Sequence, residues 1–230
     1  MKTTIKVFVV VAALALAYQA SAQIKFGVKG GVNIANVSTN WKGDFAEDEP
    51  DLKSTFGYHI GAISDISFTD KFGFQPALLL SIKGAKDEGA GYKDVTRFTY
   101  LELPLNARYN VTESFSVLAG PYLGYGLSGK NTYKEDGEQE EKTDIKFGSG
   151  EIDYDTFDSS EEMHARALDF GINLGVGYNI SKITVGANYG MGLSNILPTI
   201  TNVPGLGTID SDDWKNSNRV FSVSVAYFIK

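Results

Sequence analysis

Few side chains in this 230-residue sequence offer the chemistry of a catalytic site. The chain has two histidines, His59 and His164, and no cysteine. A serine or aspartate nucleophile needs a histidine held against it, and no spacing in the sequence places a nucleophile beside His59. The lack of cysteine excludes thiol chemistry and cysteine-based metal sites. The glycine-rich runs match no phosphate loop or dinucleotide fingerprint. We therefore expect the protein not to be an enzyme, with no catalytic residue, metal site or cofactor.

A strongly acidic segment runs from residue 131 to residue 163. It contains twelve Asp or Glu and three Lys, and its stretch EIDYDTFD brings Glu151, Asp153, Asp155 and Asp158 together. Calcium prefers clusters of carboxylate oxygens, but the EF-hand signature needs a glycine at its sixth position, and this stretch does not fit it. The segment is predicted to be a solvated acidic loop. Divalent ions bridging it to anionic lipopolysaccharide are a weaker alternative.

Seven charged side chains recur within otherwise apolar, alternating stretches and are predicted to form a polar network in a barrel lumen. They are Lys25, Lys29, Asp65, Lys83, Glu102, Arg108 and Asp169. Such a network fits either a gate for ions or a plug of paired charges, and we favour the plug because buried charges must be matched. Glu102 and Arg108 are about 20 Å apart along one strand, so they cannot pair with each other. Lys25 and Lys29 are expected near Asp65.

The elements that must position these residues alternate in hydrophobicity. In YLELPLNARY, residues 100–109, Leu101, Leu103 and Leu105 share one parity, and Glu102 and Arg108 share the other. A period of two predicts β-strands. The same pattern predicts eight strands, at residues 24–36, 54–68, 72–86, 97–109, 115–129, 165–180, 183–195 and 219–229.

The predicted connections alternate between short and long. The short ones are 69–71, 110–114 and 181–182, and the long ones are 37–53, 87–96, 130–164 and 196–218. Short turns at one end, long loops at the other and an even strand number are typical of bacterial outer-membrane barrels. We therefore predict an all-β fold, an eight-stranded antiparallel up-and-down transmembrane β-barrel over residues 23–230, with both chain ends on the periplasmic, short-turn side.

The two faces of the strands indicate which side meets lipid. One parity is apolar and uncharged through the middle of each strand, whereas the other is mostly Gly, Ala, Ser, Thr and Asn. The second face lacks the charge of a water-exposed surface and suits a narrow lumen, so the apolar face is predicted to face lipid. Aromatic residues at the short-turn ends fit an interfacial girdle; they are Phe68, Phe72, Tyr109, Phe115, Tyr178 and Tyr227.

Prolines within three of the predicted strands need an explanation, because proline removes a hydrogen bond from the ladder. They are Pro76, Pro104 and Pro121. We expect a bulge or a locally missing bond at each.

The N-terminal residues predict export. Lys2 and Lys6 precede an apolar run over residues 7–17 and then Ala20-Ser21-Ala22, which is the layout of a cleaved signal peptide, here over residues 1–22. The run is shorter than the roughly 20 residues of a spanning helix. Cleavage removes two lysines and changes the formal net charge from −7 to −9. This acidic balance argues against nucleic acid as a partner.

Several stretches resemble a known family. They are FGVKGGVNIANV at 26–37, YLELPLNARY at 100–109, GPYLGYGLSGK at 120–130, DFGINLGVGYNI at 169–180, YGMGLSNI at 189–196 and the closing NRVFSVSVAYFIK. They are similar to the outer-membrane β-barrel family of Gram-negative bacteria, whose members are often labelled porin-family or PorT-like proteins. The resemblance implies an eight-stranded barrel in the cell outer membrane and no shared catalytic residues.

We therefore expect a small integral outer-membrane protein with a largely closed lumen, in a structural or surface-interaction role through acidic extracellular loops. Large inward residues such as Tyr100 and Tyr122 should fill the lumen, since eight strands leave little space. A glycine cluster toward the extracellular half, Gly120, Gly124 and Gly126, indicates a dead-end vestibule open to the outside. Expected partners are outer-membrane lipids and lipopolysaccharide, the outer-membrane assembly machinery and an unidentified surface ligand. The alternatives are a narrow passive diffusion channel, a membrane-embedded enzyme, and a secreted soluble barrel that binds a lipophilic ligand.

Overall fold

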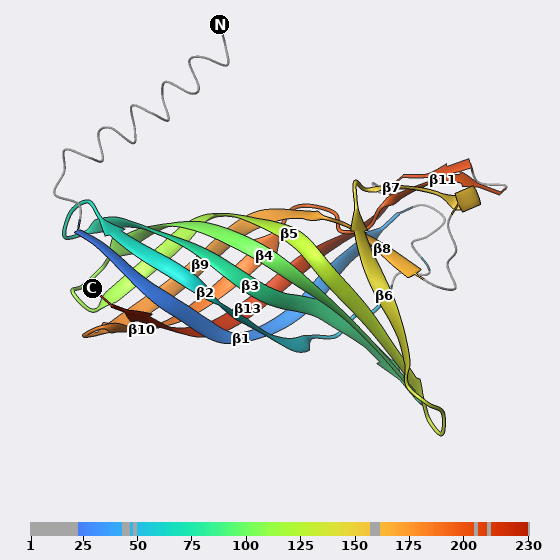
Figure 1. Cartoon of the computed structure of the whole chain (residues 1–230), viewed down its shortest axis with the longest axis horizontal. Helices are drawn as coiled ribbons and strands as arrows, with labels where there is room; N and C mark the ends of the chain where they lie inside the picture. The colour runs from blue at the N-terminus through green and yellow to red at the C-terminus, as the bar shows by residue number, and fades with distance from the viewer. Residues whose placement is uncertain are drawn as a thin grey trace, which may run out of the picture.

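Eight antiparallel strands close into a barrel. The computed structural model describes residues 23–42, 47, 50–156, 162–204, 207–210 and 213–229, so the predicted signal peptide lies outside the described residues. The barrel strands are β1 (Gln23–Trp41), β2 (Thr55–Ser67), β3 (Phe72–Gly89), β4 (Tyr92–Asn110), β5 (Phe115–Glu135), β9 (Leu168–Ile180), β10 (Ile183–Gly192) and β13 (Trp214–Phe228). Their order is β4-β3-β2-β1-β13-β10-β9-β5, and pairing of β4 with β5 closes the ring (Figure 1). The predicted all-β, eight-stranded barrel is confirmed.

The short turns lie together at one end of the barrel. They join β2 to β3, β4 to β5 and β9 to β10, and the end of β13 lies beside the start of β1 at the same end (Figure 1). The backbone N–H of Ile229 donates to the carbonyl oxygen of Phe26 at 2.8 Å. The described chain therefore begins and ends on the short-turn side, as predicted. Among the described residues, no helix is long and apolar enough to cross a membrane.

Strands continue well past the barrel at the opposite end, where long loops were predicted. Two residues, Ala90 and Gly91, connect β3 to β4, and the ladder continues to the pair Gly89↔Tyr92. The predicted loop over residues 87–96 is therefore wrong. These residues form a hairpin because hydrogen bonds between the two strands stabilise it. Such bonds do not require apolar alternation, which was the signal used to predict strands.

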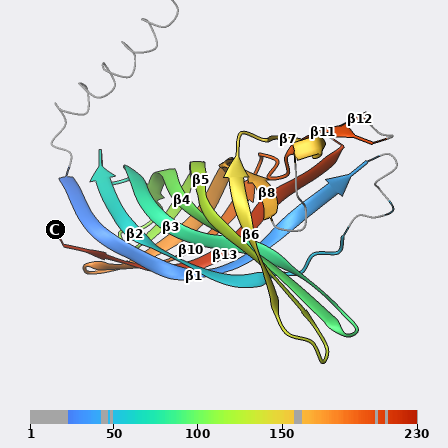
Figure 2. The ribbon, with the colours of Figure 1, turned by 45° about the vertical axis from the view of Figure 1, so that its right-hand side comes forward.

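Residues 130–164 are also largely strand rather than one loop. β5 continues to Glu135 and pairs with β6 (Glu141–Gly148), and β6 pairs in parallel with β8 (Glu162–Arg166). A separate small sheet is formed by β7 (Glu151–Asp153), β11 (Thr199–Val203) and β12 (Gly207–Ile209), next to a 3₁₀ helix at Tyr154–Thr156. Figure 2 shows this sheet and the two long hairpins on different sides of the barrel rim.

The burial pattern is the inverse of that in a soluble barrel. Large apolar side chains such as Phe26, Phe56 and Leu168 are exposed on the outside, whereas Asp169 and Lys83 are buried inside. All six aromatic residues predicted for the short-turn girdle are exposed. An exposed apolar band is stable only against an apolar solvent. The apolar parity therefore faces lipid.

The three prolines interrupt pairing without shifting the register. The β2–β3 ladder skips the positions between Ile63↔Ala77 and Ile66↔Phe74, where Pro76 lies. The β3–β4 ladder has a similar gap at Pro104, and the β4–β5 ladder has one at Pro121. The expected locally missing bonds are confirmed, and the barrel accommodates each gap without a bulge.

Candidate functional site

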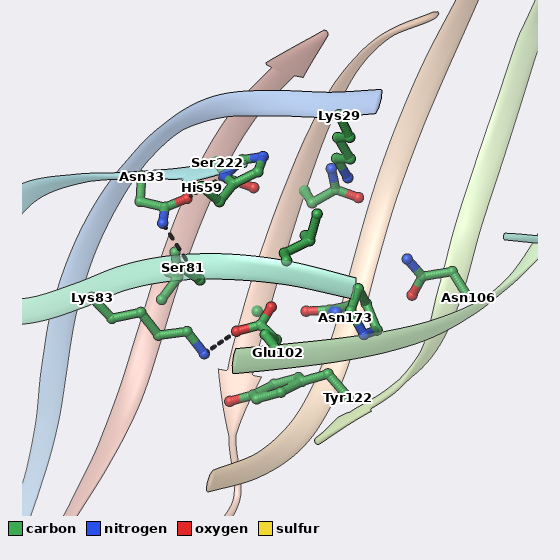
Figure 3. A pocket seen from close by; sticks show the side chains of 15 residues that line it. Lys29, Asn33, His59, Ser81, Lys83, Glu102, Asn106, Tyr122, Asn173 and Ser222 are labelled. Carbon is green, nitrogen blue, oxygen red and sulfur yellow. Dashed lines mark hydrogen bonds and ion pairs between the residues drawn. The ribbon is translucent and has the colours of Figure 1, made fainter. Parts of the chain in front are cut away.

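A charged cluster crosses the barrel lumen, centred on Lys83 of β3. The Lys83 ammonium forms an ion pair with Glu102 of the neighbouring strand β4 (Figure 3). It also lies 4.5 Å from the ring centroid of Tyr122 and 5.2 Å from that of Tyr100. Aromatic faces attract a desolvated cation. Lys83 is only 3% exposed, so its charge is stabilised by these groups rather than by water.

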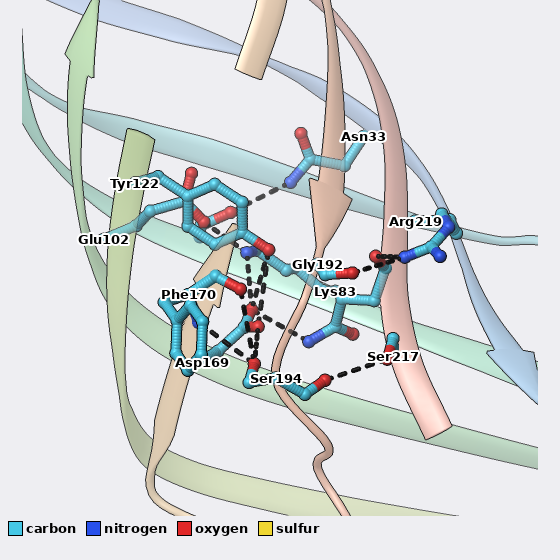
Figure 4. Close-up of polar contacts among 12 residues, drawn as sticks. Asn33, Lys83, Glu102, Tyr122, Asp169, Phe170, Gly192, Ser194, Ser217 and Arg219 are labelled. Atoms are coloured by element: carbon cyan, nitrogen blue, oxygen red, sulfur yellow. Dashed lines mark hydrogen bonds and ion pairs between the residues drawn. The ribbon is translucent and has the colours of Figure 1, made fainter. Parts of the chain in front are cut away.

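Asp169 of β9 lies opposite and is almost completely buried. Four side chains donate hydrogen bonds to its carboxylate (Figure 4): Ser194 at 2.8 Å, Asn218 at 2.9 Å, Lys83 at 3.2 Å and Tyr122 at 3.3 Å. These donors come from β3, β5, β13 and the segment after β10. A carboxylate so fully hydrogen-bonded remains stable without water. The cluster thus connects opposite walls of the barrel.

The charges in this part of the lumen balance. Lys29 of β1 lines the same small cavity as Lys83 and Glu102. Two carboxylates, Glu102 and Asp169, therefore face two ammonium groups, Lys29 and Lys83. Matched charges reduce the cost of burial. We call these paired charges, together with the side chains that donate hydrogen bonds to Asp169, the plug.

The cavity beside the plug has a volume of about 40 Å³ (Figure 3). On its wall, His59 Nδ1 forms a 2.8 Å hydrogen bond with Asn33 Oδ1, and Asn33 Nδ2 donates to Ser81 Oγ at 3.2 Å. His59 Nε2 and the side-chain oxygen of Asn106 have no hydrogen-bond partner in the described part of the chain. His59 is thus held by an amide rather than by a nucleophile. A second cavity of about 30 Å³ lies nearer the short-turn end.

A second ion pair lies near the short-turn end and corrects one prediction. Lys25 is opposite Asp65 in the β1–β2 register but is exposed, and Lys29 is opposite Gly61. Asp65 instead forms an ion pair with Arg108, at 3.2 Å. The expected cluster of Lys25, Lys29 and Asp65 is therefore wrong.

A glycine explains why Arg108 reaches Asp65. Gly73 of β3 lies between their strands and is paired with Arg108 in register. A Cβ at Gly73 would lie 2.5 Å from Arg108 Nη2, so any other residue would occupy the path of the guanidinium. Arg108 also donates to Ser67 at 2.9 Å and to Asn110 at 2.8 Å.

Two members of the Asp169 cluster were not predicted. Ser194 follows β10, and Asn218 lies within β13, in a segment expected to be loop. Asn216 and Asn218 are both buried and continue the inward parity of the last strand. That alternation of asparagines was the available signal, but asparagine is depleted in strands and so did not extend the predicted strand.

A larger cavity of about 410 Å³ lies between the plug and the long-hairpin end. Its apolar wall includes Trp41, Leu52, Phe98, Ile145 and Ile196. We call this cavity the vestibule, and its volume is in the range of roughly 300–1,000 Å³ of ligand pockets. The glycines that suggested a vestibule from the sequence, Gly120, Gly124 and Gly126, are not among its lining residues.

The acidic stretch around residues 151–158 forms no ion-binding cluster in the part that the structure describes. Asp153 accepts a 2.9 Å hydrogen bond from Asn202 and a 3.1 Å bond from the backbone N–H of Asp155. Asp158 lies outside the described residues. The carboxylate of Asp153 therefore accepts hydrogen bonds that hold this loop to β11.

Comparisons with known proteins place this geometry in a family. A family model described as outer membrane protein beta-barrel domain matches residues 17–197. Among solved structures, the chain is similar to Ail of Yersinia pestis in complex with the heparin analogue sucrose octasulfate, with 13% identity, a TM-score of 0.46, and coverage of 90% of this chain and 99% of that one. Neisserial surface protein A matches with 13% identity and a TM-score of 0.43, covering 88% and 96% of the two chains. OprG from Pseudomonas aeruginosa matches with 13% identity and a TM-score of 0.39, covering 92% and 98%. No curated protein matches the sequence.

Proposed function

Because the chain belongs to the outer membrane protein β-barrel domain family, and so resides in the cell outer membrane, we propose that it is a closed barrel that acts at the cell surface. In this proposal its lumen does not conduct and it performs no catalysis. The long hairpins and the vestibule act as the interacting parts. Its expected environment includes outer-membrane lipids and the assembly machinery.

The Asp169 cluster is the observation that carries the closed-lumen proposal. Lys83, Glu102, Tyr122, Asp169 and Asn218 come from five of the eight strands, and each of their side chains is 12% exposed or less. Charged groups locked to one another by hydrogen bonds are poor ligands for a passing ion. The lumen cavities of about 40 and 30 Å³ are each large enough for roughly one or two waters. A continuous water path would need the cluster to break.

The surface role is supported by what lies beyond the plug. The vestibule of about 410 Å³ lies on the long-hairpin side of the cluster, so its contents exchange with that side. Its lining combines apolar side chains with the carboxylates of Asp87 and Asp94. This lining suits an amphipathic or cationic surface ligand.

Conductance of the purified, folded full chain in planar bilayers tests the closed lumen. We expect no steady conductance. The matched variant is Gly124→Phe, because a Cβ at Gly124 lies in ordinary contact with Asp169 and Tyr100, so that a bulky group enters the plug region. Reproducible single-channel steps that Gly124→Phe abolishes would support the narrow diffusion channel instead.

A further inference from the structure

Four strands continue beyond the barrel as one sheet, which we call the extension. It consists of the outer parts of β3, β4 and β5 together with β6. The pairs Lys86↔Val95, Val95↔Thr132 and Thr132↔Lys142 form one row across all four strands. Figures 1 and 2 show both hairpins of the extension leaning to one side, past the outline of the barrel wall.

The two faces of the extension carry opposite charge. Strand alternation places cations on the outer face, continuous with the lipid-facing side of the barrel; they are Lys86, Lys93, Arg97, Lys130, Lys134, Lys142 and Lys146. Two acidic residues of the strands, Glu88 and Asp144, share that face. The turn between β5 and β6 adds Asp136, Glu138 and Glu140, of which Glu140 pairs with Lys142. The inner face, continuous with the lumen, carries only acidic residues beyond Lys83; they are Asp87, Asp94, Glu135 and Glu141.

The vestibule lining identifies which face is which. Ala85, Asp87, Asp94, Thr96 and Phe98 line the vestibule, so their parity faces inward. The intervening residues must then face outward. Within the four strands the outer face has seven cations and two carboxylates, a formal charge of +5, and the four carboxylates of the inner face give −4. The net negative charge of residues 131–163 as a whole does not show that cations and carboxylates lie on different faces.

The cations begin where the apolar band ends. On β4, Leu101 is exposed on the lipid-facing side, and Arg97 lies four residues further, about 13 Å along the strand. Arg97 is paired in register with Lys130 of β5. The hydrocarbon of a bilayer is bordered at this distance by polar headgroups. The first basic row therefore lies beyond the last exposed leucine of β4, on the side where headgroups border the hydrocarbon.

Several of these cations are available for an external partner. Lys134 and Lys142 are exposed. The Lys130–Asp144 ion pair joins side chains that are 53% and 76% exposed, and such surface pairs contribute little stability. The ammonium group of Lys130 can therefore exchange the carboxylate of Asp144 for a phosphate at small cost.

We propose that the outer face of the extension lies on the phosphate-bearing headgroups of the outer leaflet, which turns the acidic inner face away from the membrane. Clusters of Lys and Arg beside an anionic leaflet are attracted to it, and the leaning of the hairpins directs the outer face toward the membrane plane. This inference rests on the proposed surface role. It does not depend on the closed lumen.

Single-cysteine labelling provides the test, since the natural sequence has no cysteine. Thr132→Cys places a fluorophore on the outer face, and Thr143→Cys places one on the inner face, at matched threonines of adjacent strands. Each labelled full chain is inserted into nanodiscs of neutral lipid or of lipid with about 30 mol % of an anionic phospholipid. Quenching by acrylamide, a neutral molecule, reports the exposure of the label.

We expect anionic lipid to lower quenching of the outer-face label, at position 132, by about twofold or more and to leave the inner-face label, at position 143, unchanged. Salt at about 0.5 M should abolish the difference, because it screens exposed charges. The triple substitution Lys93→Gln, Lys134→Gln and Lys142→Gln should abolish it too, whereas Lys42→Gln, Lys71→Gln and Lys182→Gln, which are outside the extension, should not.

Equal quenching of the outer-face label in both lipids, or equal protection of both labels, would overturn the proposal. Quenching and conductance are separate measurements, so a conducting lumen would not affect this outcome.

Discussion

Replacing Lys83 with methionine tests the energetic role of the plug most directly. The substitution keeps a long side chain but leaves Glu102 and Asp169 without the cation that each contacts. At 3.2 Å from Asp169, the attraction is about 5 kcal/mol for an effective dielectric constant of about 20. Desolvation of the ammonium offsets part of this. Breaking a buried ion pair by removing one partner costs about 3–5 kcal/mol, and we expect Lys83→Met to lower the free energy of unfolding by this amount.

Urea titration of the folded protein in lipid vesicles, read by gel mobility, measures the effect. With a slope of about 2 kcal/mol per molar urea, the midpoint should fall by about 2 M. The control is Lys25→Met, because Lys25 has the same inward parity but is exposed at the rim; its midpoint should change by less than about 0.3 M. The double variant Lys83→Met, Glu102→Gln should recover about half of the loss, since the carboxylate of Asp169 retains its neutral donors Tyr122, Ser194 and Asn218 and only one unpaired buried carboxylate remains. A midpoint for Lys83→Met equal to that of Lys25→Met would refute the argument that the plug stabilises the barrel.

Three further predictions concern the lipid face, the lumen and the topology. Leu103→Arg places a charge on the lipid-facing side and should destabilise the barrel by about 2–4 kcal/mol in the same titration, whereas Leu103→Met should be nearly neutral; equal tolerance of both would contradict the assignment of the faces. Gly120→Ala should destabilise by about 1–3 kcal/mol, because its Cβ would lie 2.0 Å from the carbonyl oxygen of Leu105. Gly124→Ala is the matched control, since its Cβ would be 3.4 Å from its nearest neighbour, and a comparable loss in the control would argue against close backbone approach as the cause. Protease added to intact cells should cut within residues 131–163, and cleavage there only after permeabilisation would indicate the opposite topology.

The strands of the barrel could be predicted from sequence because their signal is local. Lipid contacts one face of each strand, so every second residue is apolar, as in Leu101, Leu103 and Leu105. That alternation requires no knowledge of the neighbouring strands. The same alternation places Lys83 and Asp169 on the opposite parity, and both side chains are buried.

The extension could not be predicted in this way. Beyond the hydrocarbon of the membrane a strand needs no apolar outer face, so residues 87–96 show no apolar alternation. Their strand conformation depends on pairing between strands, both within the β3–β4 hairpin, as in Asp87↔Asp94, and with β5, as in Lys93↔Lys134. The segregation of charge between the two faces depends on the same register.

The choice of partner inside the lumen was likewise decided by the tertiary structure. Sequence placed Asp65, Arg108, Lys83 and Asp169 on inward faces, but the stagger between strands determines which side chains meet. Arg108 reaches Asp65 across the space left by Gly73, and Lys83 reaches Asp169 across the barrel. The alternation of a strand is a property of its own residues, whereas the distance between two strands is set by all the strands that close the ring between them.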